Sequence, residues 1–579
     1  MQKKTSLLGS AAFGVLVAVG LSATAPAADA AVKKHHKAHH AVSAAPKSGA
    51  AEELHALSEQ VQALTAKLQE QEQATQAAQA QAQQAQSTAA EAQASAHAAQ
   101  EQTRAEIDTI PGAVKTEIAA EKPKDGKAHY KGVTLTVGGF AAAEGVYRSR
   151  NEIADIGSSF TKIPFDNNAV GHTSELRGTA RQSRLSLLAE GDIDQNTHAA
   201  FYTELDFLAA AQTGNSNESN SYSPRIRNVY GTLDWNDMGW GGGLHLLAGQ
   251  NWSLLTMNAK GITPRNELTP ATIDAQYVVG FAWARQPQAR ITADFDNKQI
   301  WAAVSVENPQ TTFASAATGT TGTSIPNLTV TNNGAPTSQF DSTNTLSLNH
   351  VPDVIGKLAF EPELFGARPL HLEVFGIYRQ FYDRVNVTAA NVLNLPLGAS
   401  NRETDGGGVG GGFTYTVVPK LLDLQGSIMT GKGLGRYGSG QLPDTVVGPN
   451  GELKAIPETM FLGGVTVHAT PALDLYVYGG EEHQNRVATT IGAGHYGYGS
   501  PFANLSNCSV EGASCSPDIQ LMTQLAGGFW DKIYQGSYGQ VRVGVQYSYT
   551  ELTAFSGAIG GQPKTNDSMV FTSFRYYPF

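Results

Sequence analysis

The final segment of the chain, residues 540–579, constrains the fold most strongly, because apolar and polar side chains alternate along it. Valine or tyrosine occupies every second position from Val541 to Tyr549, with Arg542 and other polar or small residues between them. This period of two places the apolar side chains on one face of a strand. An aromatic-rich run then ends on Phe579. One polar face and one apolar face that ends in tyrosines are typical of a membrane-spanning β-barrel strand, with a hairpin of a soluble sandwich as the alternative.

Similar runs recur from Val133 onward, with no amphipathic helix of comparable length among them. We identify sixteen runs: 133–148, 182–191, 199–210, 225–236, 243–251, 276–285, 289–296, 299–306, 354–361, 369–382, 405–417, 421–430, 457–468, 471–484, 536–549 and 566–579. Their short connections are Gln286-Pro287-Gln288, Pro419-Lys420 and Thr470-Pro471, and their long ones are 307–353, 383–404, 431–456 and 485–535. Short turns at one rim and long loops at the other are the asymmetry of an outer-membrane barrel. We therefore predict an all-β transmembrane barrel of antiparallel strands over residues 132–579.

The first thirty residues, 1–30, have the pattern of a secretory signal peptide. Two lysines precede the apolar run 7–21, and Ala28-Asp29-Ala30 supplies small residues for cleavage after Ala30. The run is short and contains glycine and serine, which disfavours a membrane anchor. No later stretch offers the roughly 18 apolar residues that a helical span requires. An exported chain of this kind is either soluble or a barrel in an outer membrane.

Residues 51–110 contain neither proline nor glycine, and leucine and then alanine recur at spacings of three and four. This pattern predicts an α-helical coiled coil in the periplasm, with a single unpartnered helix as the alternative. Residues 31–50 and 111–131 are interpreted as flexible linkers. The first linker contains a tract that could chelate a metal ion, although no carboxylate or cysteine completes a defined shell; the histidines are His35, His36, His39 and His40.

Net charge and motifs exclude several functions. The formal net charge of −11 argues against a nucleic-acid partner, which requires a basic face. Cys508 and Cys515 are the only cysteines, and in an exported protein their spacing indicates a disulfide within a loop. The hydrolase motifs G-x-S-x-G and H-E-x-x-H are absent. We therefore expect no enzyme activity and no cofactor. An outer-membrane lipase whose catalytic Ser, His and Asn are scattered along the chain is an alternative that a motif search does not exclude.

Charged residues recur on the strand face opposite the apolar one, which lines water in a wide barrel. Residues of this kind are Arg184, Glu204, Asp206, His245 and Arg542. Arg225 and Arg227 flank Ile226 and are expected to join them, although Asn228 and Tyr230 make the direction of that strand's side chains ambiguous. Inward arginines would attract anions, and a guanidinium group matches a carboxylate. The alternative is a set of pore-lining charges without preference for any solute.

The stretch that follows Trp252, residues 253–272, is a long connection that contains Lys260, Arg265 and Glu267. Folded into the lumen, it would form the constriction of a channel. On the outside, it would be one more surface loop, and both placements remain open.

Four short stretches carry a resemblance to a known family: Val133–Phe140, Arg181–Leu185, Arg225–Tyr230 and Leu247–Ser253. Together with the signal peptide and the Gln/Ala-rich coiled coil, they resemble the DcaP-like outer-membrane porins. The resemblance implies a sixteen-stranded, trimeric channel whose lumenal arginines favour anionic solutes such as dicarboxylates. It implies solute-binding roles for Arg184, Arg225 and Arg227.

The sequence thus predicts a diffusion porin in a bacterial outer membrane, surrounded by lipid and permeable to small anionic solutes. Its coiled coil would form a homotrimer in the periplasm and could contact the cell wall. The alternative is a structural tether or adhesin, in which the barrel only anchors the coiled coil. Whether the lumen conducts ions distinguishes the two functions.

Overall fold

The computed structural model of the chain describes residues 127–209, 223–314, 327–332, 346–390, 393–491 and 494–579. The predictions for the signal peptide, the first linker with its histidine tract, and the coiled coil lie outside these residues. The end of the second linker is described and forms strand β1 (Ala128–Tyr130), which pairs with the start of the barrel. No helix in the described ranges is long and apolar enough to cross a membrane.

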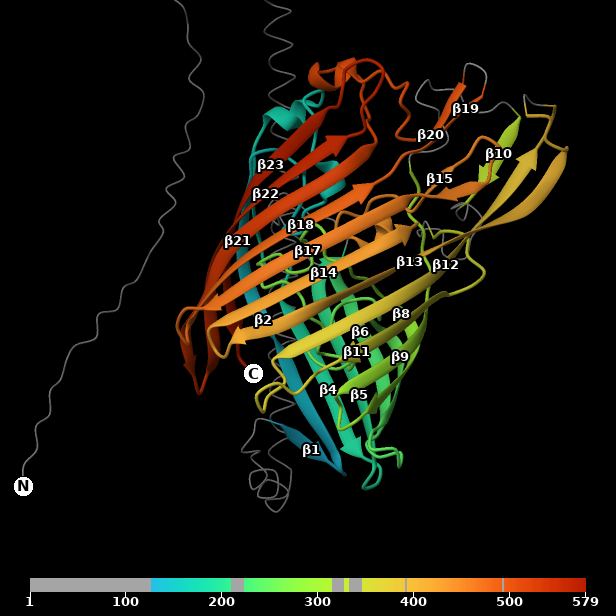
Figure 1. Ribbon diagram of the computed structural model, residues 1–579. Coiled ribbons are helices and arrows are strands. Elements are labelled where there is room, and N and C mark those ends of the chain that lie inside the picture. Colours follow the sequence, from blue (N-terminus) through green and yellow to red (C-terminus); the bar gives the residue numbers. More distant parts are fainter. Residues whose placement is uncertain (1–126, 210–222, 315–326, 333–345, 391–392, 492–493) are drawn as a thin grey trace, which may run out of the picture. The chain divides into compact units, whose positions relative to one another are not determined.

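Sixteen antiparallel strands pair in sequence order and form a closed barrel (Figure 1). They are β2 (Val133–Arg148), β4 (Arg184–Asp192), β5 (Thr197–Ala209), β6 (Ser223–Trp235), β7 (Leu244–Trp252), β8 (Arg285–Phe295), β9 (Ile300–Glu307), β11 (Asp353–Phe360), β12 (Leu370–Val387), β13 (Gly398–Val418), β14 (Leu422–Lys432), β17 (Pro457–His468), β18 (Leu473–Gln484), β21 (Ile519–Gly536), β22 (Gly539–Ala554) and β23 (Lys564–Tyr577). Closure is made by β23, which pairs with β2 from Ala141 opposite Tyr576 to Arg148 opposite Met569. The predicted barrel and its number of strands are confirmed.

Shorter elements lie at the ends of the barrel strands. Strand β3 (Glu175–Thr179) pairs with β2, and β10 (Leu328–Thr331) pairs with β12. Two small hairpins consist of β15 (Thr445–Val447) with β16 (Leu453–Ala455), and β19 (Val487–Ile491) with β20 (Gly494–Tyr498). The described residues also include four short 3₁₀ helices: η1 (Phe160–Lys162), η2 (Ala169–His172), η3 (Gly435–Tyr437) and η4 (Ser506–Ser509).

Two errors in the predicted strands offset each other. The predicted strand 276–285 is wrong, because residues 276–284 lie inside the barrel, where the apolar side chains of Val279 and Phe281 are buried. Strand β21 was missed and assigned to a long connection. Its lumenal face carries Met522 and Trp530, which are buried in the same apolar cluster, so both faces of the strand are apolar and the alternation is lost.

The connections have the predicted asymmetry. Long connections follow β2, β14 and β18, over residues 149–174, 433–456 and 485–518. At the opposite ends of the strands, residues 419–421 link β13 to β14, and residues 469–472 link β17 to β18. One predicted turn is wrong, since Gln286-Pro287-Gln288 lies within β8. The chain enters β2 and leaves β23 at the rim of the short turns, which we call the short-turn rim (Figure 1).

Candidate functional site

The side chains that face the lumen are identified by their burial and by their partners on neighbouring strands. In β4, Leu185 is 53% exposed and faces outward, whereas Arg184 lies opposite the buried Phe140 of β2. Arg184 therefore faces inward, and its guanidinium carbon lies 5.3 Å from the centre of the Phe140 ring. The same alternation directs four more of the predicted residues inward: Glu204 and Asp206 on β5, His245 on β7 and Arg542 on β22.

Strand β6 contains a β-bulge at Arg227, which explains the ambiguous direction of its side chains. Two consecutive residues of β5 pair with Ile226 and Asn228, and this leaves Arg227 as an extra residue on β6. Ile226 is 53% exposed on the outer face, while Arg227 is 2% exposed in the interior. Arg225 also faces inward, because it pairs with the buried Asp206. The buried Asn228 also faces inward, so strict alternation from it would turn Arg227 and Arg225 outward. The bulge shifts the alternation by one residue and brings both arginines to the lumenal side.

Carboxylates on β5 hold both of these arginines. The Arg225 guanidinium donates Nε to Asp206 Oδ1 at 2.9 Å and Nη2 to Asp206 Oδ2 at 2.7 Å. Arg227 donates Nη1 to Asp206 Oδ2 at 2.8 Å and Nε to Glu204. The structure thus brings four predicted site residues together as a cluster in which two positive and two negative charges balance.

Two of the predicted strand arginines have no carboxylate partner in the described part of the chain. Within the described strands and loops, neither Arg184 nor Arg542 forms an ion pair with a carboxylate, and the Nε of Arg184 is buried without a hydrogen-bond partner. Arg542 donates its Nε to Gln540, a neutral side chain, and lies 5.0 Å from the centre of the Tyr577 ring. These two side chains therefore carry net positive charge into the lumen.

A cavity of about 400 Å³ joins these groups. Its charged lining consists of Arg184, Arg227, Arg542, Arg575, His468 and Asp474. Arg575 lies opposite Arg542 in the β22 and β23 register, and its Nη2 donates to Glu144 Oε1 at 2.7 Å. Sequence reasoning missed Arg575 as a lumenal residue, although its alternation with the outward Phe574 was the signal that could have found it.

Residues 253–284, between β7 and β8, run through the inside of the barrel, and we call them the internal segment. Inward side chains of the wall accept hydrogen bonds from its backbone amides. These bonds join Leu254 to Glu307, Asn258 to Glu373, Ile273 to Gln546, Val279 to Gln524 and Gly280 to Glu482. In the reverse direction, Trp530 Nε1 donates to the Ala271 carbonyl oxygen at 2.7 Å. The wall thus satisfies buried backbone groups that would otherwise be costly to remove from water.

The three predicted constriction residues lie on the internal segment. Lys260 lines a cavity of about 620 Å³, and Arg265 lines another of about 510 Å³, with its guanidinium carbon 5.6 Å from the centre of the Tyr202 ring. Glu267 accepts a long hydrogen bond of 3.5 Å from Asn251 Nδ2. The structure therefore separates the two cations between different cavities.

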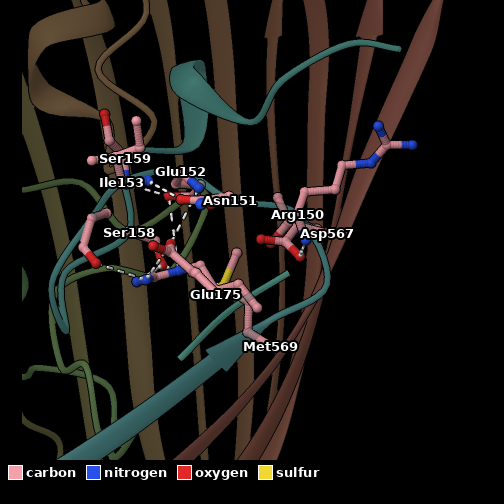
Figure 2. Close-up of polar contacts among 12 residues, drawn as sticks. Arg150, Asn151, Glu152, Ile153, Ser158, Ser159, Glu175, Asp567 and Met569 are labelled. Atoms are coloured by element: carbon pink, nitrogen blue, oxygen red, sulfur yellow. Dashed lines mark hydrogen bonds and ion pairs between the residues drawn. The ribbon is translucent and has the colours of Figure 1, made fainter. Parts of the chain in front are cut away.

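A second excursion, residues 149–174, also folds into the barrel, which the sequence did not predict. The fully buried Arg148 of β2 donates Nη1 to Glu175 Oε1 at 3.1 Å and Nη2 to Ser158 Oγ at 3.2 Å. Figure 2 shows Glu152, Ser158 and Glu175 gathered by these polar contacts. Burial raises the pKa of Glu152 to about 8, and the contact of 3.9 Å with Arg148 offsets only part of this effect.

Apolar packing and a disulfide extend this arrangement. Ile156 and Phe160 from the excursion are buried in one cluster with Ile273 and Val279 of the internal segment. Cys508 and Cys515 form a disulfide with their Cα atoms 5.1 Å apart. In addition, the backbone amide of residue 167 donates to the Cys508 carbonyl oxygen at 3.0 Å. The disulfide loop therefore contacts the excursion.

Among the described residues, no cluster of three or more His, Cys, Asp or Glu side chains could hold a metal ion.

Comparisons with known proteins give matches among solved structures alone. No family model and no curated protein matches the chain. The crystal structure of the outer membrane channel DcaP of Acinetobacter baumannii is 17% identical, covers 78% of this chain and 98% of its own, and superposes with a TM-score of 0.51. OprB of Pseudomonas putida is 9% identical over 76% of this chain and 94% of its own, with a TM-score of 0.39. OmpT of Vibrio cholerae is 10% identical over 78% of this chain and 99% of its own, with a TM-score of 0.38. The likeness to DcaP that the sequence indicated is confirmed at the level of the barrel fold.

Proposed function

We propose that this chain is an outer-membrane porin through which small hydrophilic anions, dicarboxylates among them, diffuse passively. The observation that carries the proposal is the cavity that contains Arg184 and Arg542, two cations without a carboxylate partner among the described residues. The fold shared with the DcaP channel supports it. No covalent step and no cofactor are involved.

Electrostatics favours anions in such a passage. A low-dielectric wall concentrates the field of lumenal charges and raises the local concentration of ions of opposite sign. The Arg225 and Arg227 cluster contributes little net charge, since Asp206 and Glu204 balance it. Arg184 and Arg542 therefore supply the attraction, and their planar guanidinium groups match a carboxylate oxygen pair.

The porin function also implies how the barrel is placed in the membrane. The apolar outer face, with Leu185 and Ile226 among its exposed residues, would contact outer-membrane lipid. The short-turn rim would face the periplasm, which is the side where such barrels have their short turns. Since the chain enters the barrel at this rim, the predicted coiled coil of residues 51–110 would lie in the periplasm and hold a homotrimer together.

Conductance of the refolded full-length protein in a planar bilayer tests the proposal. Under a potassium chloride gradient, we expect currents that step in threes and a reversal potential that shows anion preference. Succinate should block the current, and the variant Arg184→Ala should lose part of both the preference and the block. A correctly folded barrel that does not conduct would overturn the porin assignment and favour the structural tether.

A further inference from the structure

Three inward histidines each lie between two carboxylates. His245 of β7 has Nδ1 2.8 Å from Asp234 Oδ1 and Nε2 2.9 Å from Asp294 Oδ2. The two carboxylates come from the neighbouring strands β6 and β8, so the imidazole connects three strands. The sequence indicated His245 as a lumenal residue but gave no sign of its two partners.

The same arrangement occurs at two more places around the barrel. His371 of β12 has Nδ1 3.0 Å from Glu361 Oε1 and Nε2 3.0 Å from Glu373 Oε2. His468 follows the same plan across β14, β17 and β18. Its Nε2 lies 3.0 Å from Asp423 Oδ2, and its Nδ1 lies 2.6 Å from Asp474 Oδ1.

All three histidines lie at the short-turn rim. His245 and His371 are the second residues of β7 and β12, and His468 is the last residue of β17. The turns next to them are residues 236–243, 361–369 and 469–472. Each histidine also lines a different cavity that the internal segment borders. A solute that passes this rim through any of these cavities therefore meets one of the three groups.

Between two ionised carboxylates, the contacts favour an imidazole that carries both protons. An ionised carboxylate only accepts hydrogen bonds, and a neutral imidazole has a single N–H to donate. With carboxylate oxygens at 2.6–3.0 Å from both ring nitrogens of all three histidines, a neutral ring would direct a lone pair at one oxygen. The doubly protonated, positively charged imidazolium fits every contact.

Other charged groups set the balance at each histidine. Near His371, Lys357 Nζ lies 2.7 Å from Glu373, and Lys260, Lys298 and Arg368 line the same cavity. Near His468, Lys532 Nζ lies 3.1 Å from Asp474, and Arg542 lines the cavity.

His245 has no comparable lysine among the described residues. Arg265 and His198 line its cavity, and Trp301 stacks on its ring at 5.8 Å. His198 itself contacts Asp192 at 2.8 Å and lies 3.8 Å from Glu190. Among the groups in direct contact, the charges at His371 and at His468 sum to zero while the histidine is charged, and those at His245 sum to one negative charge.

We propose that His245, His371 and His468 are specificity-determining residues of the channel, because their positive charges neutralise a ring of carboxylates at the short-turn rim and so let anions pass. This inference rests on the proposed porin function and extends it to residues other than the arginines. Loss of the protons would make each group more negative by one unit charge and so weaken its attraction for anions. The anion preference is therefore expected to hold at neutral pH and to fall in alkaline solution.

The variant His468→Gln tests this role at a half-exposed site, and the double variant His468→Gln with Asp423→Asn is its matched control. In a planar bilayer at neutral pH, we expect the anion-to-cation permeability ratio of the single variant to fall at least about twofold, because one unit charge is removed close to the path. The double variant removes one charge of each sign and should recover the ratio. Wild-type protein titrated from neutral to alkaline pH should lose anion preference without any substitution.

The outcomes separate the two proposals. An unchanged permeability ratio in His468→Gln, or in the wild-type alkaline titration, would overturn the role of the histidines. The porin function would still be supported if the currents depend on Arg184. Absence of conductance in folded wild-type protein would overturn the porin itself. Heat-modifiable migration in gel electrophoresis verifies that each variant has formed a barrel. Where a histidine variant does not fold, the alkaline titration of Glu152→Gln tests the histidines, because Glu152 can then not contribute to the pH dependence.

Discussion

The Arg227 guanidinium lies against the carboxylate of Asp206, with Nη1 2.8 Å from Oδ2, although the two residues belong to strands that are out of step at this point. The β-bulge at Arg227 makes the contact possible, and the same carboxylate also binds Arg225. Asp206 is fully buried, and these guanidinium groups stabilise its negative charge together with the backbone amide of Leu208, which donates to Oδ1 at 3.1 Å. The cluster therefore holds both arginines against the wall, whereas Arg184 has no carboxylate partner among the described residues.

Arg184→Gln and Arg225→Gln should differ in their effect on succinate block. Arg184 lines the cavity of about 400 Å³ without an ion-pair partner among the described residues, so its loss would remove a charge-assisted hydrogen bond to the solute. Such a bond contributes about 1.5–3 kcal/mol, which corresponds to roughly a tenfold or greater loss of succinate affinity. Arg225→Gln leaves Asp206 bound to Arg227 and should weaken block less. Equal losses in titrations of single-channel block would contradict this distinction.

The carboxylate of Glu482 anchors two inward excursions at once. It accepts hydrogen bonds from the backbone amides of Gly280 at 2.9 Å and Gly440 at 3.0 Å, and its side chain is fully buried. Glu482→Ala leaves both amides without an acceptor, at a cost of about 1–3 kcal/mol for each buried donor. We expect larger fluctuations of the open-channel current in a bilayer recording. Glu482→Gln keeps an acceptor oxygen and is the control that should resemble wild type; equal noise in both variants would exclude the anchoring role.

Gly280 lets the internal segment approach the wall. Its φ is +85°, and a Cβ atom at this position would lie 1.9 Å from the carbonyl oxygen of Phe461. Gly280→Ala therefore strains the backbone and forces the segment away from β17, at a cost of about 1–3 kcal/mol. We expect a lower urea midpoint and an altered single-channel conductance. Gly356→Ala is the matched control, because a Cβ at Gly356 would meet no atom within 4 Å; a similar loss in both variants would contradict the argument.

The sequence predicts most of the barrel because lipid selects apolar residues on one face and water selects polar residues on the other. This rule fails where the lumen is filled by protein. Trp530 on β21 and Val279 on the internal segment are both apolar and both lumenal, so one strand was missed and another was predicted where none exists. The missing information is the packing of β21 against the internal segment, which includes the hydrogen bond from Trp530 to the Ala271 carbonyl oxygen and which no local period contains.

For the candidate site, alternation along the strands indicated Arg184, Arg225 and Arg227, but it could not give their partners. Whether an arginine is balanced depends on the register between strands, as the bulge at Arg227 illustrates. The carboxylates around His468 come from β14 and β18, the strands on either side of β17, so the alternation along β17 alone does not reveal them. The sequence therefore indicates which charges face water, and the fold determines which of them remain uncompensated.

Glu152 makes the fold of the excursion 149–174 sensitive to alkaline pH. Burial raises its pKa to about 8, above the usual value of 4.5, so the folded loop favours the protonated carboxyl. For a group with a raised pKa, the stabilisation is complete below the usual value and is lost as the pH rises through the folded value. Ionised Glu152 would also lie close to the negative charges of Glu175 and Asp567. We therefore expect the excursion to loosen above about pH 8.

Hydrogen exchange of the excursion measures this loosening. The amide of Ser159 donates to Glu152 Oε2 at 3.1 Å, and the amide of Glu152 donates to Glu175 Oε1 at 3.1 Å (Figure 2). Once corrected for the intrinsic dependence of exchange on pH, protection of these amides should fall between pH 7 and pH 9 in wild-type protein. Glu152→Gln cannot ionise and should keep its protection constant over the same interval. A parallel fall in both proteins would assign the pH dependence to another group, because the variant retains the size and hydrogen-bonding capacity of the side chain.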